Sequence, residues 1–241
     1  MLIPLVLLVS RGINSVMTCI KSEEIIFSIR LSLITSSIST LLCLIISLPS
    51  AYCLARLNKG YEKIASVLIF LPMSLPHLVS GIALLLFLGN SGAGRILSKL
   101  GIDFVFTKKG IVAAQVFVNM PFMIKILKTA VEDSGSKMEF ISRTLGCSRF
   151  QSFIYVVIPQ IKSSILSSAV IVWSRALGEF GAVIMLAGTT RMKTEVLPTA
   201  IFLNMSTGDL DIAIGTATIL ISISLLSMLL FEIIERKHSN Y

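Results

Sequence analysis

The sequence predicts an all-α membrane protein that crosses the bilayer several times. Its 241 residues are 54% hydrophobic and only 14% charged, and the mean hydropathy is +0.89. Soluble domains carry more charge than this, so the lipid bilayer is the expected solvent. The apolar runs are continuous over roughly 20 residues, the length of a spanning helix, whereas the strands of a membrane β-barrel alternate over about ten.

Six apolar segments predict one transmembrane domain over residues 1–241. The first lacks the basic start and the small-residue cleavage site of a signal peptide, so we do not expect a cleaved signal peptide. It is also too short for a comfortable span, so we expect a short or incomplete first span. The third contains Pro72, Pro76 and Gly81, which predict a kinked helix. A polar segment at about 130–160 follows the fourth. The expected spans are about 1–18, 29–55, 64–88, 110–127, 163–188 and 211–234.

Lysine and arginine indicate the orientation of these spans. The loops at 56–63 and 125–162 and the C-terminal tail carry eleven of them, and the opposite side carries nine. The positive-inside rule therefore predicts that both loops and the tail are cytoplasmic in a plasma-membrane protein. The external cations would also favour an anion at the entrance to a path. The net charge of +8 comes without a basic patch interleaved with aromatic residues, so we expect no nucleic-acid partner.

The predicted cytoplasmic loop contains a short amphipathic helix. In "SKMEFISRTLGCSRFQSFIYVVIPQIKSS", Met138, Ile141 and Leu145 fall at i, i+3 and i+7, which predicts a helix over 137–145 that ends at Gly146. Such a helix with an apolar stripe fits a groove on a partner protein. The alternative is a helix that lies on the membrane surface.

This loop resembles the cytoplasmic loop of ABC importer permeases, in which a Glu-Ala-Ala motif precedes a fixed glycine and a later Ile/Leu-Pro. Here the glycine is Gly146 and the proline is Pro159. The motif would fall at 140–142, which hold Phe, Ile and Ser, and Glu139 stands just before them. The sequence departs from the family pattern at these three positions.

Three further stretches are similar to the molybdate/tungstate branch of these permeases, whose relatives are the sulfate permeases. They are "LPHLVSGIALLLFLGNSGAG", "GIDFVFTKKGIVAAQVFVNMPF" and "SRALGEFGAVIMLAG". The resemblance, over about 29–236, implies a six-span permease bundle that imports a tetrahedral oxyanion, molybdate or tungstate, with sulfate or thiosulfate as the alternative. It implies a homodimer with the path at the dimer interface. It also implies an external oxyanion-binding protein and two cytoplasmic ABC ATPase subunits docked on 137–154.

The chain itself is not predicted to be an enzyme. It contains no Gly-Lys dipeptide, hence no phosphate-binding G-x-x-x-x-G-K-[ST] loop. A partner would therefore hydrolyse ATP and hold the ATP and Mg²⁺. We expect this chain to bind no cofactor and no metal, because its four cysteines lack metal-ligand spacing and fit packing positions.

Two charged residues, Arg175 and Glu179, interrupt the fifth apolar segment. Their i, i+4 spacing predicts one shared helical face and an ion pair. Intramembrane charges face a bundle interior or an aqueous path, so the pair could line the path or only clamp helices together. Gly178 and Gly181 would let another backbone approach closely.

Hydrogen-bond donors and positive charge along a route would suit a dianionic oxyanion. His77 follows the Pro72/Pro76 kink and could line this route or be a core histidine. The candidate residues of the path and its gate are Ser74, His77, Ser80, Ser174, Arg175 and Glu179. The candidate residues for coupling to the ATPase are Glu139, Ile141, Arg143, Leu145, Gly146, Phe150 and Pro159.

Three other classes of protein are conceivable. "GNSG" matches the G-x-S-G of rhomboid-type intramembrane serine proteases, with Ser91 as nucleophile, but His77 lies roughly 21 Å away along a helix. An ion-coupled secondary transporter would show inverted repeats, and none is visible. A purely structural membrane subunit would not need the amphipathic loop.

Overall fold

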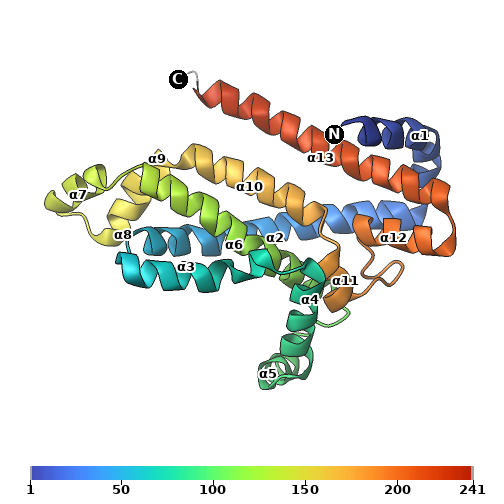
Figure 1. The fold of residues 1–241 in the computed structure, drawn as a ribbon, viewed down its shortest axis with the longest axis horizontal. Helices are drawn as coiled ribbons and strands as arrows, with labels where there is room; N and C mark the ends of the chain where they lie inside the picture. The colour runs from blue at the N-terminus through green and yellow to red at the C-terminus, as the bar shows by residue number, and fades with distance from the viewer. Residues whose placement is uncertain (1, 240–241) are drawn as a thin grey trace.

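The computed structural model describes residues 2–239, and every regular element in that range is helical. Figure 1 shows a bundle whose longest helices run roughly along one axis. The first half of the chain comprises α1 (Leu2–Lys21), α2 (Glu23–Ala55), α3 (Lys59–Ser74), α4 (His77–Leu85), a π-helical turn η1 (Leu86–Asn90), α5 (Gly92–Lys99) and α6 (Lys108–Asp133). The second half comprises α7 (Lys137–Thr144), α8 (Arg149–Ser152), a π-helical turn η2 (Phe153–Val157), α9 (Ile158–Gln160), α10 (Lys162–Leu177), α11 (Gly181–Ala187), α12 (Leu197–Thr207) and α13 (Leu210–Ser239).

Four of these helices are long and apolar enough to cross a membrane: α1, α2, α6 and α13. Two bent pairs raise the number to as many as six if each pair is one span. One pair is α3 with His77–Gly89, bent by 105°, and the other is Arg149–Gln160 with α10, bent by 74°. The all-α polytopic class predicted from composition is therefore confirmed.

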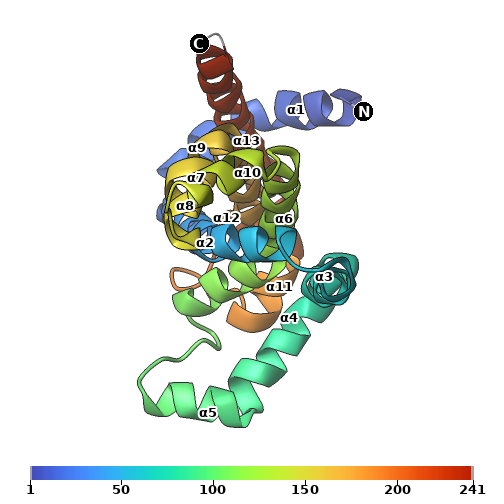
Figure 2. The same ribbon diagram turned by 90° about the vertical axis from the view of Figure 1, so that its left-hand side faces the viewer.

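The bend between α3 and α4 has a local cause. Leu75 has extended backbone, with φ −86° and ψ 144°, because the ring of Pro76 disfavours the helical conformation of the residue before it. The helix restarts at His77. As a result α4 leaves the bundle, and α4, η1 and α5 form an arm that projects from its side (Figures 1 and 2). The sequence predicted a kink here, and the structure has a near right-angle turn.

The segment expected as one helix over 163–188 consists of two. Helix α10 ends at Leu177, Gly178 caps it, and α11 begins at Gly181. The stretch is apolar on average despite Arg175 and Glu179, so its hydropathy does not mark this break. The break changes the relation between Arg175 and Glu179, as described below.

The centre of the bundle is the pair α2 and α6. Helix α2 presents a stripe of small hydroxyl residues, and among them Thr35 and Thr40 donate to carbonyls of their own helix, Leu31 O at 2.9 Å and Ser36 O at 2.7 Å. Hydroxyls satisfied in this way can face another helix without an unpaired polar atom, and their small size allows close packing. The buried members of the stripe are Ser28, Ser32, Thr35, Ser36, Ser39, Thr40 and Ser47.

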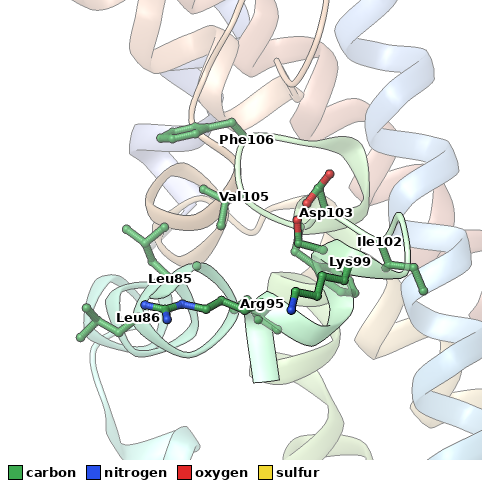
Figure 3. A pocket seen from close by; sticks show the side chains of 13 residues that line it. Leu85, Leu86, Arg95, Lys99, Ile102, Asp103, Val105 and Phe106 are labelled. Atoms are coloured by element: carbon green, nitrogen blue, oxygen red, sulfur yellow. The ribbon is translucent and has the colours of Figure 1, made fainter. Parts of the chain in front are cut away.

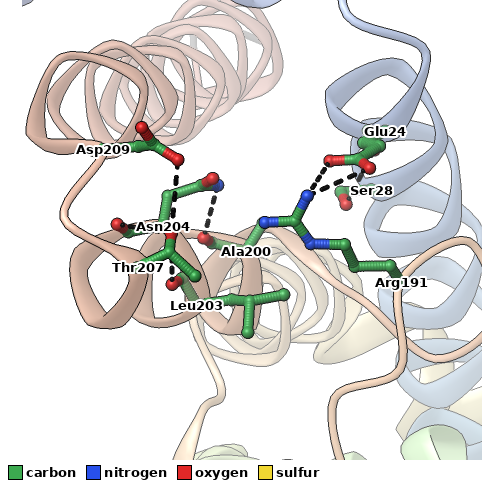
Figure 4. Close-up of polar contacts among 8 residues, drawn as sticks. All are labelled: Glu24, Ser28, Arg191, Ala200, Leu203, Asn204, Thr207 and Asp209. Atoms are coloured by element: carbon green, nitrogen blue, oxygen red, sulfur yellow. Dashed lines mark hydrogen bonds and ion pairs between the residues drawn. The ribbon is translucent and has the colours of Figure 1, made fainter.

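Polar contacts hold the segment after α11 against α2. Arg191 Nη1 lies 2.8 Å and 3.1 Å from the two carboxylate oxygens of Glu24 (Figure 4). The hydroxyl of Ser32 accepts from the backbone N–H of Leu197 at 2.8 Å, where α12 begins. These contacts fix the end of the bundle at which α2 and α12 start.

Candidate functional site

Helices α4 and α11 cross at two glycines. A Cβ at Gly81 would lie 2.7 Å from Met185 Cβ and 2.8 Å from Ala182 Cα. A Cβ at Gly181 would lie 2.8 Å from His77 Cβ. All three distances are shorter than real Cβ contacts, so only glycine allows this close approach, which is typical of membrane helices. We call this crossing the α4–α11 junction.

Glu179 lies at this junction and contacts both helices. Its side chain is 3% exposed. Its Oε2 is 2.8 Å from Nδ1 of His77, the first residue of α4, and its Oε1 accepts from the backbone N–H of Ala182 at 3.0 Å. The carboxylate therefore caps the start of α11 and ties it to α4. The sequence named both His77 and Glu179 but did not predict that they pair.

The predicted ion pair between Arg175 and Glu179 is wrong. The i, i+4 relation holds only within a continuous helix, and α10 ends between the two residues. Arg175 Nε instead donates to Asn119 Oδ1 of α6 at 3.2 Å, and its guanidinium carbon lies 4.6 Å from the centre of the Phe122 ring. Among the residues from 2 to 239 that the structure describes, Arg175 forms no ion pair.

The predicted serines have different surroundings. Ser74 is exposed and donates to Leu71 O at 2.8 Å, whereas Ser80 is fully buried in α4 and its hydroxyl has no hydrogen-bond partner in the described part of the chain. Ser174 lies half-buried on α10, next to Arg175. Of the six candidates, His77, Ser80 and Glu179 thus lie at or beside the α4–α11 junction, Ser174 and Arg175 lie on α10, and Ser74 ends α3.

Asn119 and Gln115 are polar residues of the site that the sequence reasoning missed. Both are buried in α6: Gln115 Nε2 donates to Ala176 O at 2.9 Å, and Asn119 Nδ2 donates to Gln115 O at 2.9 Å. Two amide side chains at i, i+4 within an apolar segment are unusual, and that pattern could have identified them.

The loop between α6 and α10 is anchored by one buried glutamate. Glu139 Oε2 lies 2.9 Å from Arg56 Nε, and Oε1 accepts from the hydroxyl of Tyr52; both partners stand at the end of α2. The Tyr52 ring packs on Phe153 with centroids 4.7 Å apart. Glu139 therefore faces inward and holds α7 against the bundle.

The outer side of this segment exposes large apolar side chains. We define the coupling segment as residues 137–160. The expected helix over 137–145 is present as α7, and Gly146 follows it with φ +97°. Of the predicted coupling residues, Leu145 is 81% exposed, Phe150 70% and Ile141 42%. Arg143 and Pro159 are exposed as well. The other exposed apolar residues here are Met138, Phe140, Ile154 and Tyr155.

The arm borders a cavity of about 690 Å³, which lies between η1, α5 and residues 102–106 of the loop from α5 to α6. Figure 3 shows the side chains of Arg95 and Lys99 along one wall, with Asp103 nearby. Ser91 opens this region, where its hydroxyl donates to Phe87 O and accepts from Gly94 N at 3.2 Å. These are helix-capping contacts rather than those of a nucleophile with His77 as its base.

The chain matches the family described as "Binding-protein-dependent transport system inner membrane component" over residues 44–240. Three curated proteins are similar to it. The probable transport system permease protein NifC of Clostridium pasteurianum is 34% identical over 92% of this chain and 78% of its own length. The molybdenum transport system permease protein ModB of Mycobacterium bovis is 35% identical over 83% and 75%. The sulfate transport system permease protein CysT of Escherichia coli is 32% identical over 89% and 77%.

A solved structure has the same fold. It is a bacterial ABC transporter involved in the import of the acidic polysaccharide alginate, and the TM-score is 0.79 at 20% identity. The match covers 97% of this chain and 88% of that chain. The arrangement of helices described above is therefore the fold of that transporter chain.

Proposed function

Since this chain belongs to the family of binding-protein-dependent inner membrane components, we propose that it conducts a tetrahedral oxyanion into the cytoplasm, molybdate or tungstate in the first place. The family assignment makes it the permease subunit of an ABC importer in the plasma membrane. The similarity to both ModB and CysT supports the oxyanion class, and sulfate or thiosulfate is the alternative substrate.

One observation carries the oxyanion proposal: the cationic side chain of Arg175 stands exposed within an apolar helix. Its Nε donates to the neutral side chain of Asn119. None of the described residues forms an ion pair with Arg175, so its positive charge is not neutralised within the chain. A charge at membrane depth is costly unless it faces water or a counter-ion. A passing dianion would supply that counter-charge transiently. A protein carboxylate paired permanently with Arg175 would prevent Arg175 from attracting the dianion.

Coupling to ATP hydrolysis requires a partner, and permeases of this family work with ATPase subunits and an external binding protein. We assign the ATPase contact to the coupling segment, because its exposed Leu145 and Phe150 form an apolar surface fit for a groove. The two ATPase subunits would hold the ATP and Mg²⁺ and carry out hydrolysis. Because the ATPase subunits are cytoplasmic, the proposal requires that the coupling segment and the C-terminus lie on the cytoplasmic side of the membrane.

The arm suggests where a second copy of the chain would pack. It projects from the bundle, and its helix α4 exposes Leu78, Val79 and Ile82. A second copy would bury these side chains in a homodimer with the path between the subunits. Arg95 and Lys99 of the arm would then place positive charge on the external side, where the binding protein delivers the anion.

Uptake by vesicles that hold the assembled complex tests this function. Labelled molybdate, tungstate and sulfate are supplied with the external binding protein and ATP. We expect ATP-dependent uptake of at least one oxyanion, and Arg175→Gln should lower it while the complex still assembles. Uptake of none of the three, from a complex that hydrolyses ATP, would refute the oxyanion proposal.

A further inference from the structure

A groove runs along α6 between α3 and α10. It encloses about 470 Å³. Met73 at the end of α3 and Ser164 at the start of α10 form its flanks. The surface of α6 supplies Phe122, Lys125, Ile126, Thr129, Ala130 and Asp133.

The groove begins at Phe122, the residue whose ring Arg175 contacts. The guanidinium of Arg175 lies over the ring of Phe122, and Phe122 is the first α6 residue of the groove. Lys125 follows three residues later, roughly 4.5 Å farther along the helix axis and on the same face. The two cations are therefore consecutive along one surface that leads from the middle of the bundle towards the coupling segment.

Lys125 differs from its neighbour Lys128. Lys128 contacts the carboxylates of Glu62 and Glu132, the latter at 3.3 Å. Lys125 is exposed, and within residues 2–239 as described no carboxylate lies within ion-pair distance of its ammonium group. It also lies eight residues before the end of α6, so it belongs to the helix and not to the loop.

We propose that Lys125 is a second anion station, which receives the oxyanion from Arg175 and passes it towards the cytoplasmic end of α6. This assignment rests on the proposed function. Arg175 and Lys125 share the attraction of a dianion, and the hydroxyl of Ser164 adds a donor to the same groove, whereas the hydroxyl of Thr129 already donates to Lys125 O at 3.2 Å. Asp133 lies two turns beyond Lys125, and its negative charge disfavours retention at the exit.

The first experiment removes the charge of Lys125 in the assembled complex. We expect Lys125→Gln to lower oxyanion uptake about tenfold, equivalent to about 1.4 kcal/mol of lost attraction. ATP hydrolysis stimulated by the binding protein should continue. Lys125→Arg should retain uptake because it keeps the charge. The matched control is Lys63→Gln, an exposed lysine of α3 that does not line the groove.

A second experiment restores the charge chemically. Lys125→Cys is placed in a chain whose Cys53 and Cys147, the two cysteines that are not buried, are serine. A thiol reagent that adds a trimethylammonium group should recover uptake, whereas one that adds a sulfonate should not. If both leave uptake equal, or if Lys125→Gln transports like the parent, Lys125 is not a station. If the parent complex itself moves no oxyanion, the proposed function fails instead, so the two failures are distinguishable.

Discussion

Two buried glutamates, Glu139 and Glu179, hold two regions of the molecule in different ways. Glu139 pairs with Arg56 and fastens the coupling segment to the end of α2. Glu179 pairs with His77 and fastens α11 to α4. The first partner is always charged, and the second is charged only when protonated. Both pairs bridge helices distant in sequence, so each glutamate is a tertiary link.

The region around the Glu139–Arg56 pair is packed differently from the region around the Glu179–His77 pair. The coupling segment is held on its inner side and leaves Leu145 and Phe150 in contact with solvent. The α4–α11 junction has no free space, because Gly81 and Gly181 are already in contact with the opposite helix. The outer side of the coupling segment is therefore free to gain a partner, whereas the contact between α4 and α11 is already close-packed within the chain.

The largest effect should follow from opening the α4–α11 junction. Gly81→Leu places side-chain atoms where Ala182 and Met185 stand, so we expect a loss of more than about 3 kcal/mol, beyond ordinary overpacking. The amount of folded complex after solubilisation measures it. Gly60→Leu is the control, since a Cβ there meets nothing within 4 Å. Equal yields of the two variants would show that the crossing is not close-packed.

A smaller effect is expected at the coupling segment. Glu139→Gln removes a charge-assisted hydrogen bond to Arg56, which should cost about 1.5 to 3 kcal/mol in the attachment of α7. The chain should still insert, but ATP hydrolysis should respond less to the binding protein. A double-mutant cycle with Arg56→Gln measures the coupling energy. Additive losses in that cycle would mean that the pair does not anchor the segment.

Substitutions at Gly146 change the backbone conformation that the coupling segment needs at the end of α7. Its φ of +97° is unfavourable for any residue with a Cβ, and nothing lies within 4 Å of the Cβ position. Gly146→Leu should therefore cost about 1–2 kcal/mol of local stability through strain alone, and Gly146→Asn should cost less. Binding of the ATPase subunit to the two variants measures this. Unchanged ATPase binding and normal transport in Gly146→Leu would favour a segment that only lies on lipid.

The smallest effect concerns a third buried carboxylate, which lacks such a partner. Glu195 precedes α12; burial raises its pKa, and the nearby Glu24 raises that pKa further. A raised pKa means that the folded state binds the proton more tightly, so stability should fall as pH rises above the ordinary carboxyl range. Glu195→Gln should flatten this dependence in thermal unfolding from pH 4 to 8. A steeper slope in the variant would contradict the assignment.

Hydropathy predicted the fold class because lipid imposes long apolar helices, and Pro72, Pro76 and Gly81 predicted a kinked helix where the structure has a 105° bend. The amphipathic pattern of 137–145 predicted α7. The prediction of an Arg175–Glu179 pair failed because spacing arguments assume a continuous helix, and hydropathy does not mark the break at Gly178. The pairs His77–Glu179 and Arg56–Glu139 could not be predicted, since each depends on the tertiary packing of helices distant in sequence.

Helix α1 packs mainly on α13, with Gly215 against Cys19 and Gly12 against Thr218. The ribosome makes these two helices about 200 residues apart, and domains assemble as the chain emerges. During synthesis α1 therefore remains in the bilayer with α2 as its chief neighbour until α13 is inserted. The bundle is therefore complete only after α13, the last helix to be synthesised, has inserted. A chain that stalls before α13 would leave the small-residue face of α1 exposed to other membrane helices.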